Sequence, residues 1–197
     1  MNHPLGSGFP EAYRAASDSI SAESDRGAVL VAASMLETHL KTLIQNRLLV
    51  TEDSNDKLFS GAMAPLSTFS ARTEMAYRLG LITGDTKSML NLFRSVRNDF
   101  AHRFEFTSFD DQSIHDRLHN AFRAQKDIYD ALVAEAKQYC EDALIELNEG
   151  SSDVDFTMEE DWPLRTTFNI FFAMTVAALA SLGPDVERIP AQITNRG

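Results

Sequence analysis

The chain has 197 residues, of which 44% are hydrophobic and 24% are charged, so it holds enough apolar material for the core of one domain. Its formal net charge is −11, from 29 acidic and 18 basic side chains, and this charge disfavours a direct grip on a DNA duplex. One cysteine, Cys140, excludes an internal disulfide, and the first ten residues lack the basic and apolar pattern of a signal peptide. We therefore expect a cytoplasmic protein.

Helical periodicity dominates the first half of the chain, where strand signals are weak. A short helix is expected over residues 10–21, followed by a longer one over about 24–49 whose apolar residues recur every three to five positions. Residues 53–56 are polar and predict a loop. A third helix is expected over 65–79, and Gly80 is expected to end it in a left-handed conformation.

Further helices are expected in the second half. Thr83 predicts the cap of a fourth helix that runs to about His102, and Asp110 predicts the cap of a fifth. A sixth is expected over about residues 126–147. Since no glycine or proline separates the fifth from the sixth, one continuous helix over both is an alternative.

The last predicted helix covers about residues 163–182 and is apolar nearly all round. Such a helix must be covered on more than one face, so it is either the central helix of the bundle or part of a subunit interface. We favour the central position over a membrane span, because its most apolar stretch, 168–182, is short and holds three polar residues. Together the elements predict an all-α, single-domain bundle of six or seven helices, with its core at about 20–182 and loose termini at 1–9 and 184–197.

Charge is spread unevenly along the sequence. Residues 135–161 hold ten acids and one base, which predicts a solvated face or, as the alternative, a surface for a basic partner. Residues 70–105 hold six bases and four acids, and they form the one locally positive strip that a phosphate-bearing ligand would meet.

The segment Ser95–His102 is the most informative part of the chain. Arg97 can hold a phosphate by two hydrogen bonds and His102 can move a proton near neutral pH, a pair that suits RNA cleavage without a metal. On an ideal helix the two side chains lie about 140° apart, so they converge only if the helix frays or a second copy supplies the partner. The alternative is structural: Arg97 pairs with a carboxylate such as Glu37, and His102 closes the helix end.

Several stretches of the chain carry a resemblance to known families. They are Asp25-Arg26-Gly27-Ala28-Val29-Leu30-Val31, Leu36-Glu37 with Leu40, Ala76-Tyr77-Arg78-Leu79-Gly80-Leu81-Ile82, and Arg97-Asn98-Asp99-Phe100-Ala101-His102. In order and type of element, about residues 20–182 closely resemble the mannitol operon repressor family of bacterial regulators. The Arg-Asn-x-Phe-Ala-His string is the most specific part, and it is also similar to the motif of the wider group of helical proteins called HEPN domains.

The two resemblances imply different functions. The repressor family implies negative control of the transcription of genes for sugar-alcohol uptake and use, acting through another regulator because the family has no recognisable DNA-reading element. The HEPN group implies a ribonuclease, usually a dimer that brings two motifs together, and places Arg97, Asn98 and His102 on its active-site motif. We favour the repressor resemblance because it spans most of the chain.

Two other candidate sites are weaker. Residues 111, 115 and 119 are Asp, His and His, four apart on one predicted helix face, but no further ligand completes a zinc site, and we expect no metal and no cofactor. The turn at 79–84 is the one candidate helix-turn-helix, and its second helix would also have to bury apolar residues in the core.

The sequence therefore predicts a non-enzymatic repressor that works through other regulatory proteins as a homodimer, touching DNA weakly or indirectly and no membrane. The residues expected to bind a partner or ligand are Arg97, Asn98, His102, Arg94 and Arg72. The alternative is a HEPN-type, metal-independent ribonuclease that acts on RNA with Arg97 and His102.

Overall fold

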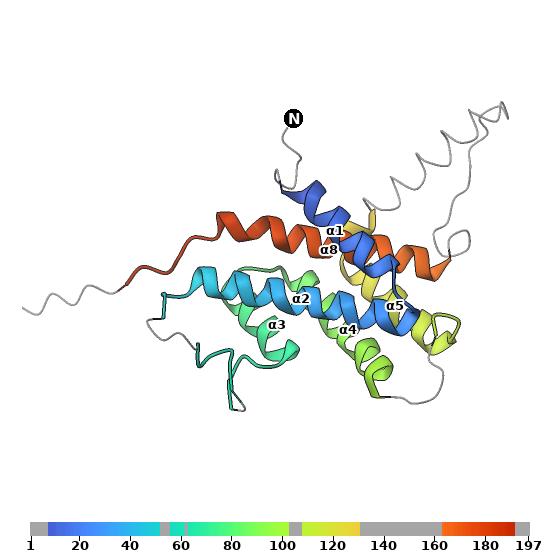
Figure 1. Cartoon of the computed structure of the whole chain (residues 1–197), viewed down its shortest axis with the longest axis horizontal. Helices are drawn as coiled ribbons and strands as arrows, with labels where there is room; N and C mark the ends of the chain where they lie inside the picture. The colour runs from blue at the N-terminus through green and yellow to red at the C-terminus, as the bar shows by residue number, and fades with distance from the viewer. Residues whose placement is uncertain (1–7, 52–55, 62, 103–107, 131–162, 192–197) are drawn as a thin grey trace, which may run out of the picture.

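The computed structural model describes residues 8–51, 56–61, 63–102, 108–130 and 163–191, and within these ranges it contains helices and no strand. The helices are α1 (Phe9–Ser21), α2 (Asp25–Arg47), α3 (Phe69–Arg78), α4 (Gly84–His102), α5 (Gln112–Ala124) and α8 (Leu164–Leu182), with a short 3₁₀ turn, η1 (Gly183–Asp185) (Figure 1). The predicted all-α bundle is confirmed.

Helix α8 lies at the centre of the bundle. It runs along α2 and is crossed by α1, and it also touches α5 (Figure 1). Its side chains Phe168, Phe171 and Phe172 are fully buried, so α8 contributes to the core, as the predicted central position requires. By length and composition α2 and the segment Leu164–Asp185, which contains α8, are each apolar enough to cross a membrane. The two helices pack against each other, and each places a row of buried apolar residues in the core.

Aromatic rings fill the space between α8 and its neighbours. The ring of Phe172 lies 4.1 Å from that of Phe93 on α4, and the ring of Phe171 lies 4.7 Å from that of Phe122 on α5, measured between centroids. Each such pair adds about 0.5–1.5 kcal/mol to the burial of its apolar area. This cluster fixes α4, whose outer face carries the candidate site, on the core.

Local capping chemistry sets several helix ends. Thr83 caps α4 as predicted and Ser24 caps α2, each hydroxyl accepting a backbone N–H at 3.2 Å, from Thr86 and Gly27. Gly80 ends α3 with φ +72°, which lets the N–H of Leu81 bond the carbonyl of Ala76 at 2.9 Å.

Two predicted helix starts are wrong. Helix α3 begins at Phe69 and not at Pro65, because the N–H of Leu66 bonds the carbonyl of Leu58 at 2.8 Å and holds residues 64–67 in turns. Helix α5 is capped by Asp111, whose carboxylate accepts the N–H of Ser113 at 2.8 Å, and not by Asp110.

The alternative of one continuous helix over α5 and the sixth helix is also wrong at the point where the two meet. Gln125 leaves helical geometry, with φ −109° and ψ 66°, before residues 126–130 turn helical again. The rest of the predicted sixth helix, the acidic run at 135–161 and Cys140 lie outside the described residues.

The ends of the bundle are more ordered than predicted. The N–H of Ile189 bonds the carbonyl of Arg47 at 2.8 Å, and the Arg47 guanidinium donates to the carbonyl of Glu187 at 2.7 Å. Residues 187–189 are therefore held against the end of α2, so the loose C-terminal segment does not begin at residue 184. At the other end Phe9 is 7% exposed and belongs to the core, so the loose N-terminal segment does not extend to residue 9.

Candidate functional site

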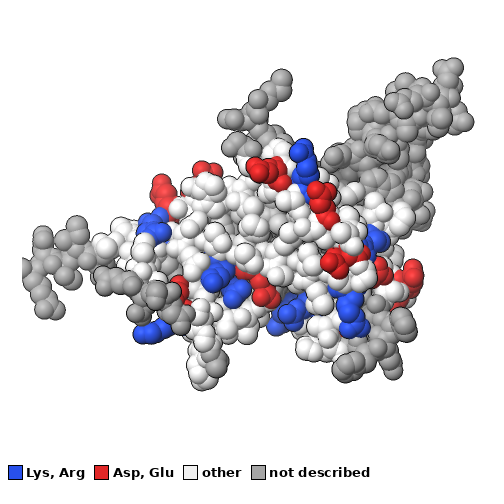
Figure 2. All heavy atoms as spheres, in the orientation of Figure 1, with Lys and Arg blue, Asp and Glu red and all other residues white. Residues whose placement is uncertain are grey.

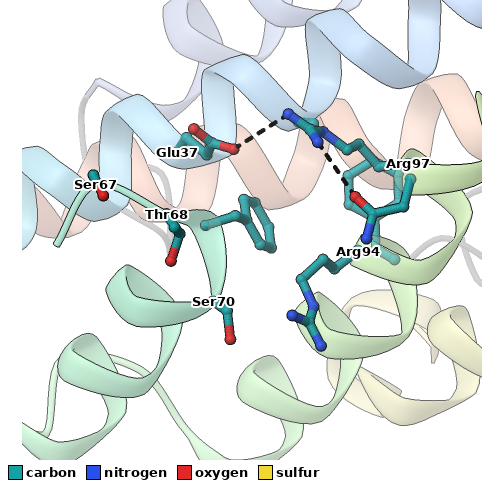
Figure 3. A pocket seen from close by; sticks show the side chains of 10 residues that line it. Glu37, Ser67, Thr68, Ser70, Arg94 and Arg97 are labelled. Atoms are coloured by element: carbon teal, nitrogen blue, oxygen red, sulfur yellow. Dashed lines mark hydrogen bonds and ion pairs between the residues drawn. The ribbon is translucent and has the colours of Figure 1, made fainter. Parts of the chain in front are cut away.

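A cleft of about 400 Å³ lies between α2, α3 and α4 (Figure 3). It is lined by residues from α2 (Ala33, Glu37), from the start of α3 (Ser67, Thr68, Phe69, Ser70) and from α4 (Phe93, Arg94, Arg97, Asn98). Its apolar members, Ala33, Phe69 and Phe93, are buried, while the remaining members are polar or charged. Three of the residues predicted to bind a partner, Arg94, Arg97 and Asn98, therefore share one cavity.

Glu37 holds two of the predicted arginines at the cleft. Its carboxylate oxygens lie 4.0 Å from Nη2 of Arg97 and 3.6 Å from Nη1 of Arg72. The predicted structural pairing of Arg97 with Glu37 is thus confirmed. The pairing fixes the direction of the Arg97 side chain without closing the cavity, because that side chain remains 36% exposed.

Arg72 does not line the cleft. Its Nε donates to the carbonyl of Leu66 at 2.9 Å and its Nη1 to the carbonyl of Glu37 at 3.3 Å, and its side chain is 13% exposed. A cation in this position orients Glu37 and ties α3 to α2. The structure therefore places Arg72 behind the site as a positioning residue.

Within the described residues, the Arg97 guanidinium uses only some of its hydrogen-bond donors. Its Nη1 donates to Oδ1 of Asn98 at 3.3 Å (Figure 3). Its Nε is buried and has no hydrogen-bond acceptor among the described residues. Because Nε is enclosed, a ligand in the cleft can meet only the exposed part of this side chain.

Arg94 is the most open cation of the cleft. It lies one turn before Arg97 and Asn98, so all three side chains share a face of α4. It is exposed, and within the described ranges no carboxylate pairs with it. Figure 3 shows its guanidinium extending toward the start of α3, on the side of Ser70.

His102 lies outside the cleft. It is the last residue of α4, is exposed, and does not line the cavity that holds Arg97. The two residues are five apart on a regular helix, and this spacing directs their side chains to different faces. The structure of one chain therefore does not bring the predicted catalytic pair together.

The hydroxyl groups at the start of α3 were missed by the sequence analysis. Thr68 caps the helix by accepting the N–H of Ala71 at 3.2 Å, and Ser67 and Ser70 flank it on the cleft wall. The wrongly predicted start at Pro65 placed these residues inside a helix. The Ser-Thr pair before an apolar residue is an N-cap signal that would have revealed them.

The other candidates remain structural. Asp111 caps α5, and the described residues contain no group of three side chains that could hold a metal ion. In the candidate helix-turn-helix, Nζ of Lys87 lies 2.6 Å from the carboxylate of Glu74 and 4.4 Å from the ring centre of Tyr77. These contacts keep Lys87, the first basic residue of α4, against α3.

The described residues are nearly neutral, with 15 basic and 16 acidic side chains. On the face drawn in Figure 2, Lys and Arg are interspersed with Asp and Glu. Most of the net negative charge lies in residues 131–162, which hold ten acids and one base. The cleft is thus not covered by a strongly negative field from the helices that build it.

Comparisons of the chain with protein-family models, with curated proteins and with solved structures find no match.

Proposed function

We propose that the protein is a transcriptional regulator of repressor type that acts through contacts with other regulatory proteins. One observation carries the proposal: the cleft gathers Arg94, Arg97 and Asn98 and leaves His102 outside. Guanidinium and amide groups recognise anionic and polar partners by directed hydrogen bonds. A cavity that has these groups but lacks the imidazole favours binding over proton transfer.

The packing of α4 supports action through a partner and not through direct reading of DNA. A recognition helix presents one open face to the major groove. Helix α4 buries Met89, Phe93 and Val96, and it is flanked by α2, α3 and α5. Since Lys87 is paired with Glu74 and Arg94 faces the cleft, little of the helix is left to enter a groove.

The resemblance to the mannitol operon repressor family supports the same proposal. It suggests control of genes for sugar-alcohol use by a cytoplasmic homodimer. The partner would contact the cleft of each copy, with the Arg94, Arg97 and Asn98 side chains as the recognising groups.

The test combines transcript measurement with DNA binding. Cells that lack the gene should show raised levels of a defined set of transcripts, and wild-type protein should restore their repression. Pure protein should not shift the promoter DNA of those genes at physiological salt. Tight, sequence-specific binding by the protein alone would reject the partner-dependent mechanism.

A second candidate is a metal-independent ribonuclease of the HEPN type, favoured by the Arg97 side chain, which lines the cleft and is 36% exposed. In a homodimer the second copy would supply His102 to the phosphate held by Arg97. His102 would take the proton of a ribose 2′-hydroxyl, whose oxygen attacks phosphorus and expels the 5′-oxygen, which takes a proton from solvent water as it leaves.

Incubation of cellular RNA with the wild-type protein and with His102→Ala decides this second candidate. Cleavage by the wild type in the presence of a chelator, lost in the variant, would support it. Identical RNA profiles for the two proteins would remove it.

A further inference from the structure

We propose that the cleft between α2, α3 and α4 binds a phosphate monoester, whose phosphate sits between Arg94 and the start of α3. The inference rests on the proposed function, because it names the chemical group by which the cleft recognises its ligand. The group can be borne by a phosphorylated side chain of a partner protein or by a free alcohol phosphate. The two share one anionic group and one mode of recognition.

Donors converge on the space that the phosphate would occupy. The Arg94 guanidinium extends from α4, and the hydroxyls of Ser67 and Ser70 lie at the opposite wall (Figure 3). At the start of α3 the Thr68 hydroxyl accepts the N–H of Ala71. The earlier first-turn N–H groups, of Phe69 and Ser70, have no intrahelical acceptor, and none is found in the described part of the chain.

The helix start alone would be a weak anion site. Here it faces independent cationic side chains, because Arg94 and Arg97 line the same cavity from a different helix. The partial positive charge of the helix end and two guanidinium groups therefore act on one volume.

The charges around the cleft favour a ligand with two negative charges. Two arginines, Arg94 and Arg97, line the cleft, and the one carboxylate that lines it, Glu37, is also paired with Arg72 behind it. Since Arg72 offsets the charge of Glu37, the two positive charges of Arg94 and Arg97 are left for a ligand. A phosphate monoester carries about −1.5 to −2 charges at neutral pH and three acceptor oxygens, whereas a carboxylate carries one charge and two oxygens.

The cavity is larger than an inorganic phosphate needs, and its inner wall is apolar. A volume of about 400 Å³ falls in the range typical of sites for small organic ligands. Phe69 and Phe93 lie among its lining residues and are 8% and 0% exposed. Phe93 is enclosed, so carbon atoms of the ester can contact the exposed edge of Phe69, and an organic ester should bind more tightly than inorganic phosphate.

The test is an NMR titration of the ¹⁵N-labelled full chain at constant ionic strength. The probes are inorganic phosphate, glycerol 3-phosphate and a phosphoserine peptide, with acetate as the anion control. We expect saturable shifts of the amide signals of Phe69 and Ser70 and of the Arg94 Nε signal with the phosphate probes. Stronger binding of the peptide or of the alcohol phosphate identifies which kind of molecule bears the group.

Matched variants locate the site. Arg94→Gln should weaken binding of the phosphate probes about tenfold, the effect of losing a charge-assisted hydrogen bond. Arg78→Gln removes an exposed arginine of α3 that does not line the cleft, and it should bind as the wild type does. Ser70→Ala should weaken binding by a smaller factor without altering the net charge.

Equal shifts with acetate and phosphate, or equal affinities of the Arg94→Gln and Arg78→Gln proteins, would overturn the inference. Thermal unfolding of each variant confirms that the exposed substitution leaves the fold intact. If the protein represses transcription but binds no phosphate, this inference is refuted and the proposed function is not. If the protein binds phosphate in the cleft but controls no transcript, the proposed function is refuted and phosphate binding is not.

Discussion

Replacement of Arg165 by alanine should lower the free energy of unfolding by about 3 kcal/mol. This arginine joins the start of α8 to the turn between α1 and α2. Its two Nη atoms donate to Oδ1 of Asp25 at 2.8 Å and to the carbonyls of Ile20 and Glu23 at 3.1 and 2.6 Å. Its Nε donates to Oδ1 of Asn169 at 3.0 Å.

The magnitude follows from the number and exposure of these bonds. A hydrogen bond from a charged donor contributes about 1.5–3 kcal/mol when buried, and neighbouring bonds do not add fully. The Arg165 side chain is 25% exposed, and water can replace part of what is lost. A loss of about 3 kcal/mol should lower the midpoint of thermal unfolding by roughly 10 °C in a chain of this size.

Urea unfolding followed by circular dichroism measures the effect. Arg14→Ala is the matched control, because Arg14 is exposed on α1 and should change stability by less than about 0.5 kcal/mol. Arg165→Lys should recover only part of the loss, since an ammonium cannot present the same planar fork of donors. A loss below about 1 kcal/mol for Arg165→Ala would refute the role of this clamp.

Three further outcomes are expected from stability measurements. Phe172→Ala should cost about 3–5 kcal/mol in urea unfolding, because the ring is fully buried against Phe93; a cost under about 1 kcal/mol would contradict the central place of α8. Gly80→Ala should cost about 1–2 kcal/mol through backbone strain at φ +72°, whereas Gly84→Ala should not, and equal effects would show that the left-handed turn is unimportant. Burial lowers the pKa of His39 below its ordinary value of 6.5, so the unfolded chain takes up the proton first as the pH falls, and stability should be full above pH 6.5 and decrease below it. His39→Gln should flatten this part of the pH profile, and an unchanged profile would assign the loss to other groups.

The helices could be predicted from sequence because their apolar periodicity is local. The continuous apolar surface of α8 already implied a covered helix, and the spacing of Arg97 and His102 already implied that they diverge. The pairing of Arg97 with Glu37 was also foreseen, since a long cation beside a core needs a carboxylate within reach.

The parts that could not be predicted depend on competition between near-equal local signals or on distant contacts. Asp110 and Asp111 are adjacent potential caps, but Asp111 accepts the N–H of Ser113 while the Asp110 carboxylate accepts the Ser108 hydroxyl at 3.5 Å. The C-terminal segment is held by the hydrogen bond from the Arg47 guanidinium to the backbone carbonyl of Glu187, and these two residues are far apart in the sequence. The cleft itself is a tertiary feature: Ser70 and Arg94 share no periodic pattern that would place them on facing walls.

The most direct test of the account is the level of the regulated transcripts in cells whose only copy of the gene carries a cleft substitution, with protein amounts matched. Arg94→Gln combined with Arg97→Gln should release repression as fully as loss of the gene, while Arg78→Gln and His102→Ala should both repress like the wild type. Full repression by the double cleft variant, or loss of repression by His102→Ala alone, would contradict the claim that this cavity recognises a partner and does not cleave one.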